Sequence, residues 1–319
     1  MIQLSLLDQK TWDLYFRQIP ASNLLQSWAY GEAKKNAESW KADRYLLSSK
    51  ERHLALVQVL TKKIFHKLQL VRINRGPLFI PQDVTETEMK ACYQELLKKF
   101  GPLHGQPTFF APELQETPKS QNILADSKKW LLRRQAGFTS ALLDLREDTE
   151  LLRKKLAGKW RNQLNAAEKT PLSVQINSSD EQFEWLVKAY EQSMLEKKFS
   201  GISAPTLREL KKQLGPHFTL VTVSLPEEQT PFAGVFLAEH GSTATYLVGV
   251  HQSKTSSNKK LTGITNLLLW NAILHLSKKG LQHLDLGGLD EKNNPGITHF
   301  KKGLNGQEYS LLGDYFILM

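Results

Sequence analysis

The stretch THFKKGLNG, residues 298–306, places two adjacent lysines, Lys301 and Lys302, between a phenylalanine and a glycine. A lysine ammonium is a compact cation on a long side chain, and beside a reacting carbonyl it can stabilise negative charge that develops on the oxygen. A surface turn could equally hold both lysines in solvent. Because successive residues of an extended chain point to opposite faces, we expect the two not to share one buried place.

No residue is marked by its surroundings as a general base. The candidates near these lysines are Asp285, Asp290 and His299. Asp285 stands between two leucines on an expected strand and could equally be a structural carboxylate, while His299 is typical of a surface turn. An acceptor amine that is already deprotonated, or that a neighbouring substrate group deprotonates, needs no base.

Composition sets the class of protein. A chain of 319 residues favours two domains, and 40% hydrophobic residues are enough to build their cores. No apolar run is long enough to span a membrane, and MIQLSLLDQKTWD lacks the pattern of a secretory signal. The single cysteine, Cys92, excludes an internal disulfide and any multi-cysteine metal site. We therefore expect a cytoplasmic monomer without a metal.

The formal charge of +10 favours polyanionic partners. Basic residues are concentrated in the expected helix at 151–169, where Lys155, Lys159 and Arg161 accompany Trp160. Such a surface could follow an RNA backbone, with an affinity that falls as salt is added. The alternative is a solvated helix face with Trp160 in the core, and the sequence does not choose between the two.

The elements that would position these residues follow one order in both halves. In the second half, helical patterns at 180–199 and 205–214 precede three β-rich runs (218–225, 232–239 and 243–250), a helix at 264–280 and a strand at 281–289. The first half has helices at 11–19 and 24–36, strands at 44–49, 53–63 and 68–79, a helix at 87–101 and a strand at 107–114. This order is that of an acyl-CoA N-acyltransferase (GNAT-like) domain.

The sequence therefore predicts an α/β (α+β) fold of two tandem GNAT-like domains, each with a mixed sheet flanked by helices. We place the N-terminal domain at 1–148, joined by a C-terminal strand at about 307–319, and the C-terminal domain at 149–306. The glycine-spaced loop that would hold the pyrophosphate of an acyl-CoA is missing from SSNKKLTGIT, residues 256–265. Motifs of nucleotide hydrolysis, dinucleotide binding, serine hydrolases and zinc proteases are missing too.

Four stretches together resemble the FemABX family: SWAYGEAKK at 27–35, the basic helix at 151–169, LDLGGL at 284–289 and FKKGLNGQEYSLLGDYFI at 300–317. Enzymes of that family transfer amino acids from aminoacyl-tRNA to the stem peptide of peptidoglycan precursors. No heptad segment that could form the coiled-coil arm of longer members occurs, so the chain resembles the compact members. The resemblance implies aminoacyl-tRNA as donor in place of acyl-CoA, and no cofactor.

The resemblance also implies roles for particular residues. Phe300 and Lys301 match the family's pair at the catalytic cleft, Phe300 beside the tRNA stem and Lys301 as the electrostatic group. Lys34 matches a lysine that helps hold the precursor, with Lys35 adjacent, and Tyr246 matches a tyrosine of the cleft. We add Lys302 as a second contact to phosphate.

We therefore expect an aminoacyltransferase that moves a small amino acid from aminoacyl-tRNA to an amine. The expected acceptor is a peptidoglycan precursor, UDP-linked or lipid-linked, or a related amine, and a peripheral contact with the membrane stays open. The alternatives are an acyl-CoA-dependent N-acyltransferase on the same fold and a non-catalytic RNA-binding protein. Neither the amino acid nor the exact acceptor can be named from the sequence.

Overall fold

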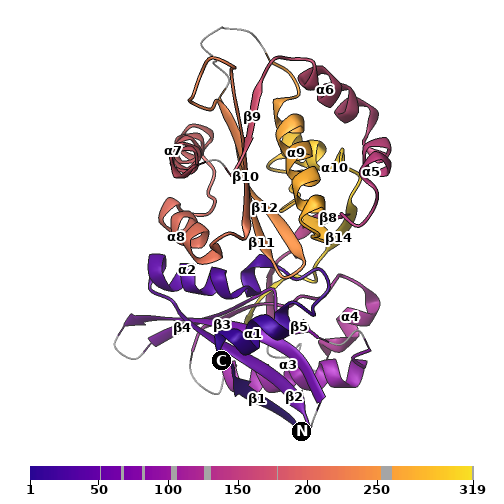
Figure 1. Ribbon diagram of the computed structural model, residues 1–319. Helices are drawn as coiled ribbons and strands as arrows, with labels where there is room; N and C mark the ends of the chain where they lie inside the picture. Colours follow the sequence, from indigo (N-terminus) through magenta and orange to yellow (C-terminus); the bar gives the residue numbers. More distant parts are fainter. Residues whose placement is uncertain are drawn as a thin grey trace. The chain divides into compact units, whose positions relative to one another are not determined.

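The computed structural model describes residues 1–50, 52–65, 68–80, 83–101, 106–125, 131–177, 179–252 and 261–317. The chain divides into two compact units, one formed by residues 1–139 with 309–319 and the other by residues 140–308 (Figure 1). The first boundary falls earlier than the expected junction at 148/149. The reason is that the apolar run SALLDL forms a strand of the second unit's sheet.

The first unit is built on a mixed sheet. Its strands follow the order β1-β2-β3-β4-β6-β15-β7, with β5 paired to β3. The strands are β1 (Ile2–Leu6), β2 (Lys41–Ser49), β3 (Arg52–Phe65), β4 (Leu68–Asn74), β5 (Leu78–Phe79), β6 (Thr108–Ala111), β7 (Leu131–Gln135) and β15 (Asp314–Ile317). Strands β4 and β6 are parallel, and β15 returns from the end of the chain to lie between β6 and β7.

Helices pack against both faces of this sheet. They are α1 (Gln9–Phe16), α2 (Trp28–Glu38), α3 (Glu86–Phe100) and α4 (Pro118–Ile123), with the 3-10 turn η1 (Leu24–Gln26). Helix α3 begins at a capping box between Thr85 and Glu88, and it buries a stripe formed by Cys92, Tyr93, Leu96 and Leu97. This helix joins the parallel pair β4 and β6, as the sequence predicts.

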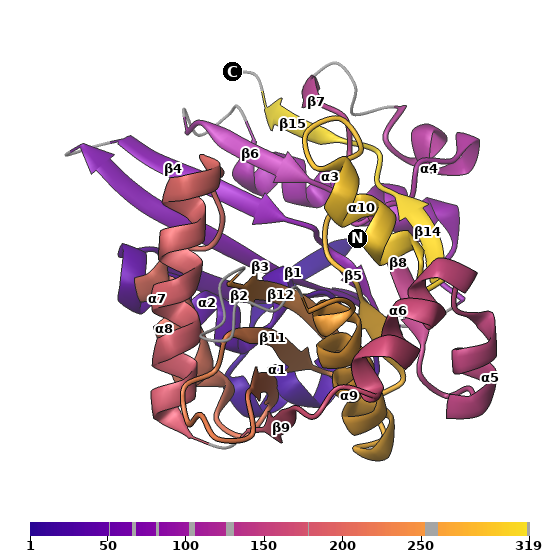
Figure 2. The same ribbon diagram turned by 90° about the horizontal axis from the view of Figure 1, so that it is seen from above.

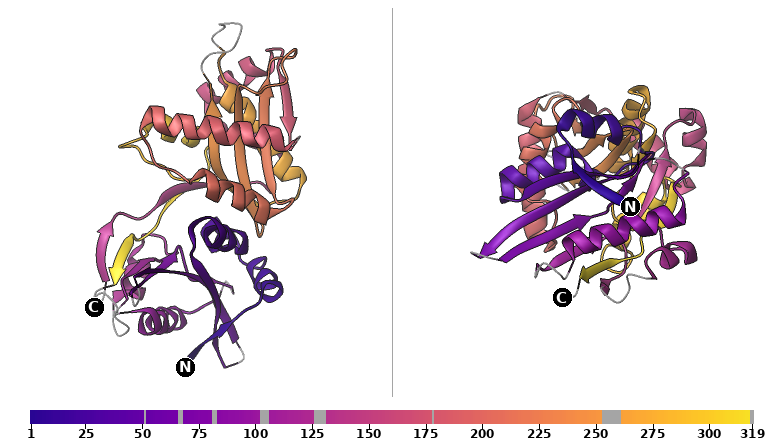
Figure 3. Two further views of the ribbon diagram at one scale, coloured as in Figure 1. Left: turned by 90° about the vertical axis from the view of Figure 1, so that its left-hand side faces the viewer. Right: turned by 90° about the horizontal axis from the view of Figure 1, so that it is seen from below.

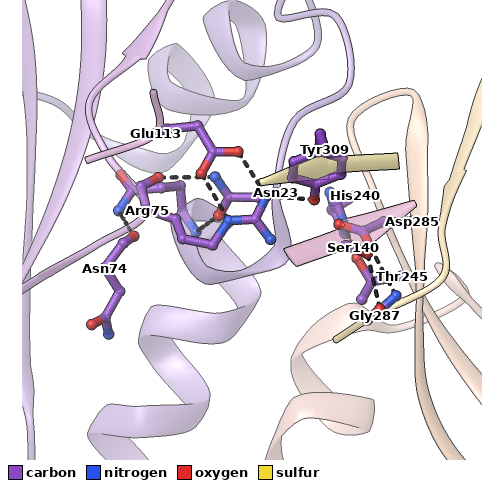
Figure 4. Close-up of polar contacts among 11 residues, drawn as sticks. Asn23, Asn74, Arg75, Glu113, Ser140, His240, Thr245, Asp285, Gly287 and Tyr309 are labelled. Atoms are coloured by element: carbon purple, nitrogen blue, oxygen red, sulfur yellow. Dashed lines mark hydrogen bonds and ion pairs between the residues drawn. The ribbon is translucent and has the colours of Figure 1, made fainter. Parts of the chain in front are cut away.

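The C-terminal segment is held in the first unit by side chains as well as by β15. Arg75 forms two hydrogen bonds of 2.7 Å to Glu113, and a third of 3.0 Å to the hydroxyl oxygen of Tyr309 (Figure 4). The backbone oxygen of Arg75 accepts from Asn23 at 2.9 Å. Residues from four distant parts of the sequence are thereby joined.

The second unit has a seven-stranded sheet in the order β14-β8-β13-β12-β11-β10-β9. The strands are β8 (Thr139–Asp144), β9 (Ser173–Ile176), β10 (Phe218–Ser224), β11 (Ala233–His240), β12 (Thr243–His251), β13 (His283–Asp285) and β14 (Gln307–Ser310). The three β-rich runs predicted at 218–250 form the antiparallel meander β10–β12, and the strand predicted at 281–289 contains β13, which pairs in parallel with β12.

The helices of the second unit are α5 (Thr149–Lys155), α6 (Gly158–Glu168), α7 (Asp180–Lys197), α8 (Ala204–Leu214), α9 (Ile264–Lys278) and α10 (Pro295–Lys302). Helices α7 and α8 cross one face of its sheet, while α6 and α9 pack together on the other (Figures 2 and 3). The basic segment 151–169 is therefore two helices, broken before Gly158. Residues 295–302 are helical, which corrects the extended conformation that we assumed for Lys301 and Lys302.

Candidate functional site

The candidate site begins where β12 and β13 separate. The two strands are paired for only three residues each, ending at Thr245 opposite Asp285. The next amide, that of Leu286, donates to the carbonyl of Ala141 in β8 and not to β12. Tyr246 is thus the first residue of β12 beyond the paired segment.

Asp285 fixes the turn that follows the separation. Its Oδ1 accepts from the amide of Gly287 at 2.9 Å and from the hydroxyl of Ser140, which also lies 2.9 Å from the carbonyl oxygen of Gly287 (Figure 4). Gly287 adopts φ +71°, and a Cβ there would lie 2.8 Å from the carbonyl oxygen of Tyr246. Glycine is therefore required for the turn to approach β12 so closely.

Lys301 reaches this turn from α10. Its side chain is buried, with 8% of the residue exposed, and its Nζ donates to the carbonyl of Gly288 at 2.9 Å. The ammonium also lies 5.5 Å from the centroid of the Tyr246 ring, a cation–π distance. One hydrogen bond to Gly288 leaves two N–H donors on the ammonium.

Burial lowers the pKa of Lys301 to about 8, and the nearby negative charge of Asp285 opposes this shift. No carboxylate of the described residues lies within ion-pair distance of Nζ. The fold thus buries a cation, and the contacts that the described residues make to it are a carbonyl dipole and an aromatic ring. An electrostatic group that must meet new negative charge has these properties.

Tyr246 lies beside the lysine that the resemblance also singled out. Burial raises the pKa of its hydroxyl to about 12, so the phenol is neutral at physiological pH. A Cβ on Gly249 would meet the Tyr246 hydroxyl at 2.0 Å, which means that the ring lies along its own strand over that glycine. The second unit therefore brings together two of the predicted residues that lie 55 positions apart in the sequence.

The neighbours of Lys301 on α10 lie elsewhere. Phe300 stacks on Trp160 at 5.9 Å between ring centroids, against the core of the unit. Lys302 forms ion pairs with Glu291 at 2.6 Å and Glu308 at 3.0 Å. The roles predicted for these two side chains, a contact to the tRNA stem and a second contact to phosphate, stay predictions.

The base candidates differ in their surroundings. Asp290 is held by hydrogen bonds from the side chain and amide of Asn293, which lower the pKa of its carboxyl. His299 is exposed. Asp285 is buried and its Oδ1 already accepts two hydrogen bonds, which fits the structural alternative.

The residues predicted to bind tRNA lie on α5 and α6. Lys155 is paired with Glu147 at 2.6 Å, and Arg161 donates to the carbonyl of Lys154 at 3.0 Å. Lys159 is exposed. Trp160 is buried, as the solvated-helix alternative expected, so the tRNA contact stays a prediction.

Lys34 belongs to α2 of the first unit. Its ammonium is paired with Glu38 one turn later, and only 11% of the side chain is exposed. Lys35 is paired with Glu32 at 3.2 Å and is largely exposed. Of the two, Lys34 is the more enclosed lysine.

A cofactor site is not evident in the described part of the chain. No group of three His, Cys, Asp or Glu side chains there could hold a metal ion, and no described helix is long and apolar enough to cross a membrane. Much of the loop judged to lack the pyrophosphate pattern lies outside the described residues. The described end of that loop holds Gly263, which precedes α9 at φ +76° with no side-chain cap.

Sequence reasoning missed Ser140, Gly287 and Gly288 as parts of this site. Ser140 precedes Asp285 by 145 positions, and only the sheet order places β8 next to β13. The glycine pair was visible as a strand terminator. What could not be seen was that its second carbonyl holds Lys301.

Comparisons with known proteins define the class first. Residues 153–302 match the model of the acetyltransferase (GNAT) domain, a range that includes Tyr246, Asp285 and Lys301. Together with the two mixed sheets, this match confirms the predicted α/β fold of GNAT type and supports an acyltransferase. No curated protein matches the sequence significantly.

Several solved structures have a similar fold. The chain resembles a structure described as FemX, with a TM-score of 0.79 at 15% identity over 99% of this chain and 97% of that one. It also resembles the C-terminal domain of a putative lysylphosphatidylglycerol synthetase from Agrobacterium fabrum, with a TM-score of 0.59 at 12% identity over 97% and 92%. A tandem GNAT protein of the clavulanic acid pathway scores 0.56 at 12% identity over 99% and 98%. The resemblance to the FemABX family is thereby confirmed in the fold.

Proposed function

We propose that this protein is an aminoacyltransferase that moves a small amino acid from aminoacyl-tRNA to an amine, with a peptidoglycan precursor stem peptide as the acceptor. The observation that carries the proposal is the buried ammonium of Lys301, held where β12 and β13 separate without a carboxylate partner among the described residues. A solvated lysine in a turn would have argued against it.

Aminoacyl transfer from an ester to an amine is favoured by such a cation. The acceptor amine attacks the carbonyl carbon of the ester, negative charge gathers on the carbonyl oxygen, and the ribose hydroxyl leaves with a proton. The two remaining N–H donors of Lys301 can stabilise this oxygen or the neighbouring ribose–phosphate. Removing one such donor typically lowers the rate by about 10²–10³. The amine supplies the proton that the leaving oxygen takes, so the reaction balances without a protein base.

Tyr246 and the Gly287 turn keep the ammonium in place. The ring of Tyr246 limits its movement on one side and the carbonyl of Gly288 holds it on the other. A preorganised donor needs no reorganisation as charge develops, which is the source of its effect on rate. In this proposal Lys34 contributes to holding the acceptor, and the reaction takes place in the cytoplasm.

The choice of donor rests on the resemblance and on the missing pyrophosphate pattern. FemX and the putative lysylphosphatidylglycerol synthetase are the likenesses that favour aminoacyl transfer. The acceptor could be UDP-linked or lipid-linked, and the same chemistry serves either.

The test supplies the full chain with total aminoacyl-tRNA carrying labelled amino acids and with UDP-linked or lipid-linked precursor. We expect label to move to the precursor, and Lys301→Met to lower kcat by about 10²–10³ with little change in KM for tRNA. Lys302→Met is the matched control for kcat, since it removes the adjacent lysine, which is paired with Glu291 and Glu308. Loss of the second phosphate contact predicted for Lys302 would appear in the KM for tRNA instead. Transfer from acyl-CoA alone, and never from tRNA, would sink the proposal.

A second candidate is an acyl-CoA-dependent N-acyltransferase. The observation in its favour is that the range matched by the GNAT domain model includes Tyr246, Asp285 and Lys301 of the candidate site. For this candidate, acetyl-CoA should raise the Tm of the protein, whereas deacylated tRNA should not. The first proposal predicts the reverse.

A further inference from the structure

A row of side chains in the first unit combines unpaired cations with aromatic rings. Arg72 of β4 lies opposite Phe109 of β6, Phe109 opposite Phe316 of β15, and Phe316 opposite Leu132 of β7. Their sequence neighbours Val71, Phe110 and Ile317 belong to the core of the unit. Because side chains alternate along a strand, the row lies on the sheet face opposite that core.

Three cations occupy this face. Arg72 lies 5.6 Å from the centroid of Phe109 and 5.8 Å from that of Trp40. Lys62 lies 5.7 Å from the centroid of Trp40, and Arg134 lies 5.3 Å from that of Phe109. We call Lys62, Arg72, Arg134, Trp40, Phe109 and Phe316 the aromatic–basic face.

Among the described residues, these cations have no carboxylate partner, unlike most others in the first unit. No described acid lies within ion-pair distance of the three, and Nε of Arg72 is buried without a hydrogen-bond partner. The acids at the border are already engaged, Glu38 with Lys34 and the Trp40 indole, and Asp314 with Gln135. A guanidinium nitrogen without a partner among the described residues can donate to an acceptor atom of a ligand.

The distance between the cations indicates how long an anion must be to contact all of them. Lys62 lies on β3 and Arg134 on β7, four strand positions apart in the sheet. At roughly 4.8 Å per position these strands are about 19 Å apart, which is too far for one diphosphate to contact both. A chain of phosphates can contact all three, and half-buried rings between cations are the pattern of single-strand binding surfaces.

We propose that the aromatic–basic face binds single-stranded RNA, its cations contacting successive phosphates and Phe109 and Phe316 offering ring surface to a base. This inference rests on the proposed function, which identifies the strand as the unpaired acceptor end of the donor tRNA. The exposed Leu132, at 52%, extends the apolar surface at the β7 end of the row.

The test measures fluorescence anisotropy of a labelled ten-nucleotide RNA ending in CCA, with the full chain and over a range of salt. The triple variant Lys62→Gln, Arg72→Gln, Arg134→Gln should bind about tenfold or more weakly, and its slope of log K against log salt should be shallower by about 2. The matched control, Lys10→Gln, Lys212→Gln, Lys278→Gln, changes the net charge equally at exposed lysines. It should leave the slope nearly unchanged.

Leu132→Glu is the second variant, and it covers the case in which Arg72→Gln disturbs folding. It adds an acid beside the aromatic–basic face at an exposed position, where the fold should tolerate it. It should also weaken binding. Equal binding and equal slopes for the sheet triple and the control would overturn the inference. So would complete displacement of the RNA by UDP, which would make the face a nucleotide subsite. No amino acid is transferred in this binding assay. A negative result here therefore does not affect the transfer test with Lys301→Met, and a negative transfer test does not affect the binding result.

Discussion

Two buried cations, one in each unit, are satisfied in opposite ways. Arg44 of β2 donates to Glu32 and Gln58 at 2.9 Å and to the carbonyl of Trp28 at 3.1 Å, and it lies 3.6 Å from the Trp28 ring centroid. Lys301 has one carbonyl and a more distant ring. Both are less than a tenth exposed. The difference separates a cation that holds a fold together from one that is kept ready for a ligand.

The surroundings of Arg44 explain its sequence context. A Cβ on Gly31 would lie 2.1 Å from Gln58 Oε1 and 2.5 Å from an Arg44 nitrogen, so α2 can approach the network only at a glycine. The stretch SWAYGEAKK thus encodes the docking of α2 through Arg44. The comparable glycine of the second unit, Gly287, brings a turn near Lys301, whose ammonium donates to Gly288 and keeps two further N–H donors.

The largest effect on stability is expected at Arg44. Arg44→Met should destabilise the protein by roughly 3–5 kcal/mol, because Glu32 and Gln58 then stay enclosed without their partner. Urea unfolding gives the value. Arg52→Met is the control: Arg52 is also paired with two carboxylates, but it is 40% exposed, and its replacement should matter much less. Equal losses for both variants would contradict the comparison.

Lys301→Met should change the stability in the opposite direction, making the protein more stable. The folded protein lowers the pKa of Lys301 from 10.5 to about 8, so below pH 8 it holds a cation that the unfolded chain carries more easily. This pKa shift corresponds to a loss of at most about 3 kcal/mol in the free energy of unfolding. A methionine removes that loss, but it also removes the hydrogen bond to Gly288. We expect the variant to be more stable than the wild type at pH 7.

The pH dependence provides an independent check of that sign. Between pH 8 and 10.5 the folded protein has released the proton and the unfolded chain has not, so this contribution to stability rises with pH in that window. The advantage of Lys301→Met over the wild type, measured in urea at pH 7.5, 8.5 and 9.5, should therefore shrink. A constant or growing advantage would show that Lys301 is not strained by its burial.

Asp285→Asn should act through Lys301 and have a smaller effect. The amide keeps an oxygen for Ser140 and Gly287 but loses the charge that raises the pKa of Lys301. The cationic fraction at pH 7.5 should fall, lowering transfer by a few-fold, and the decline of rate at high pH should begin earlier. Competitive acetylation of Lys301 with acetic anhydride, read by mass spectrometry, detects the same shift without a transfer assay. Asp290→Asn is the control.

The order of elements in the sequence was sufficient for the tandem architecture, whereas the cleft roles of Tyr246 and Lys301 came from the family resemblance. Periodicity gave α3, α7, α8 and α9, since each buries a regular stripe, and the meander β10–β12 followed from alternation and short turns. It failed for residues 295–302, where we assumed an extended conformation for Lys301 and Lys302 and the chain forms α10. Packing of Phe300 on Trp160 decides that helix, and this contact joins positions 140 apart.

The partners of Lys301 could not be predicted for the same reason. The carbonyl of Gly288 is a backbone group that no side-chain pattern marks, and Ser140 reaches Asp285 only through the pairing of β8 with β13. Local patterns determine elements, whereas the sheet order determines which elements share a site. The family resemblance compensated for this at Lys301 and Tyr246, because it carries spatial information that one sequence lacks.

The smallest effect is expected at Lys302, the cation with the most carboxylate contacts on α10. Both of its partners, Glu291 and Glu308, stand at or near the surface, and exposed ion pairs contribute little because water and salt screen them. Lys302→Gln should leave the urea midpoint and the kcat of transfer unchanged, and loss of its predicted contact to phosphate should appear only in the KM for tRNA. A loss of transfer comparable to that of Lys301→Met would mean that the number of carboxylates around a lysine does not distinguish the functional cation from the structural one. The contrast between Lys301 and Arg44 would then have another cause.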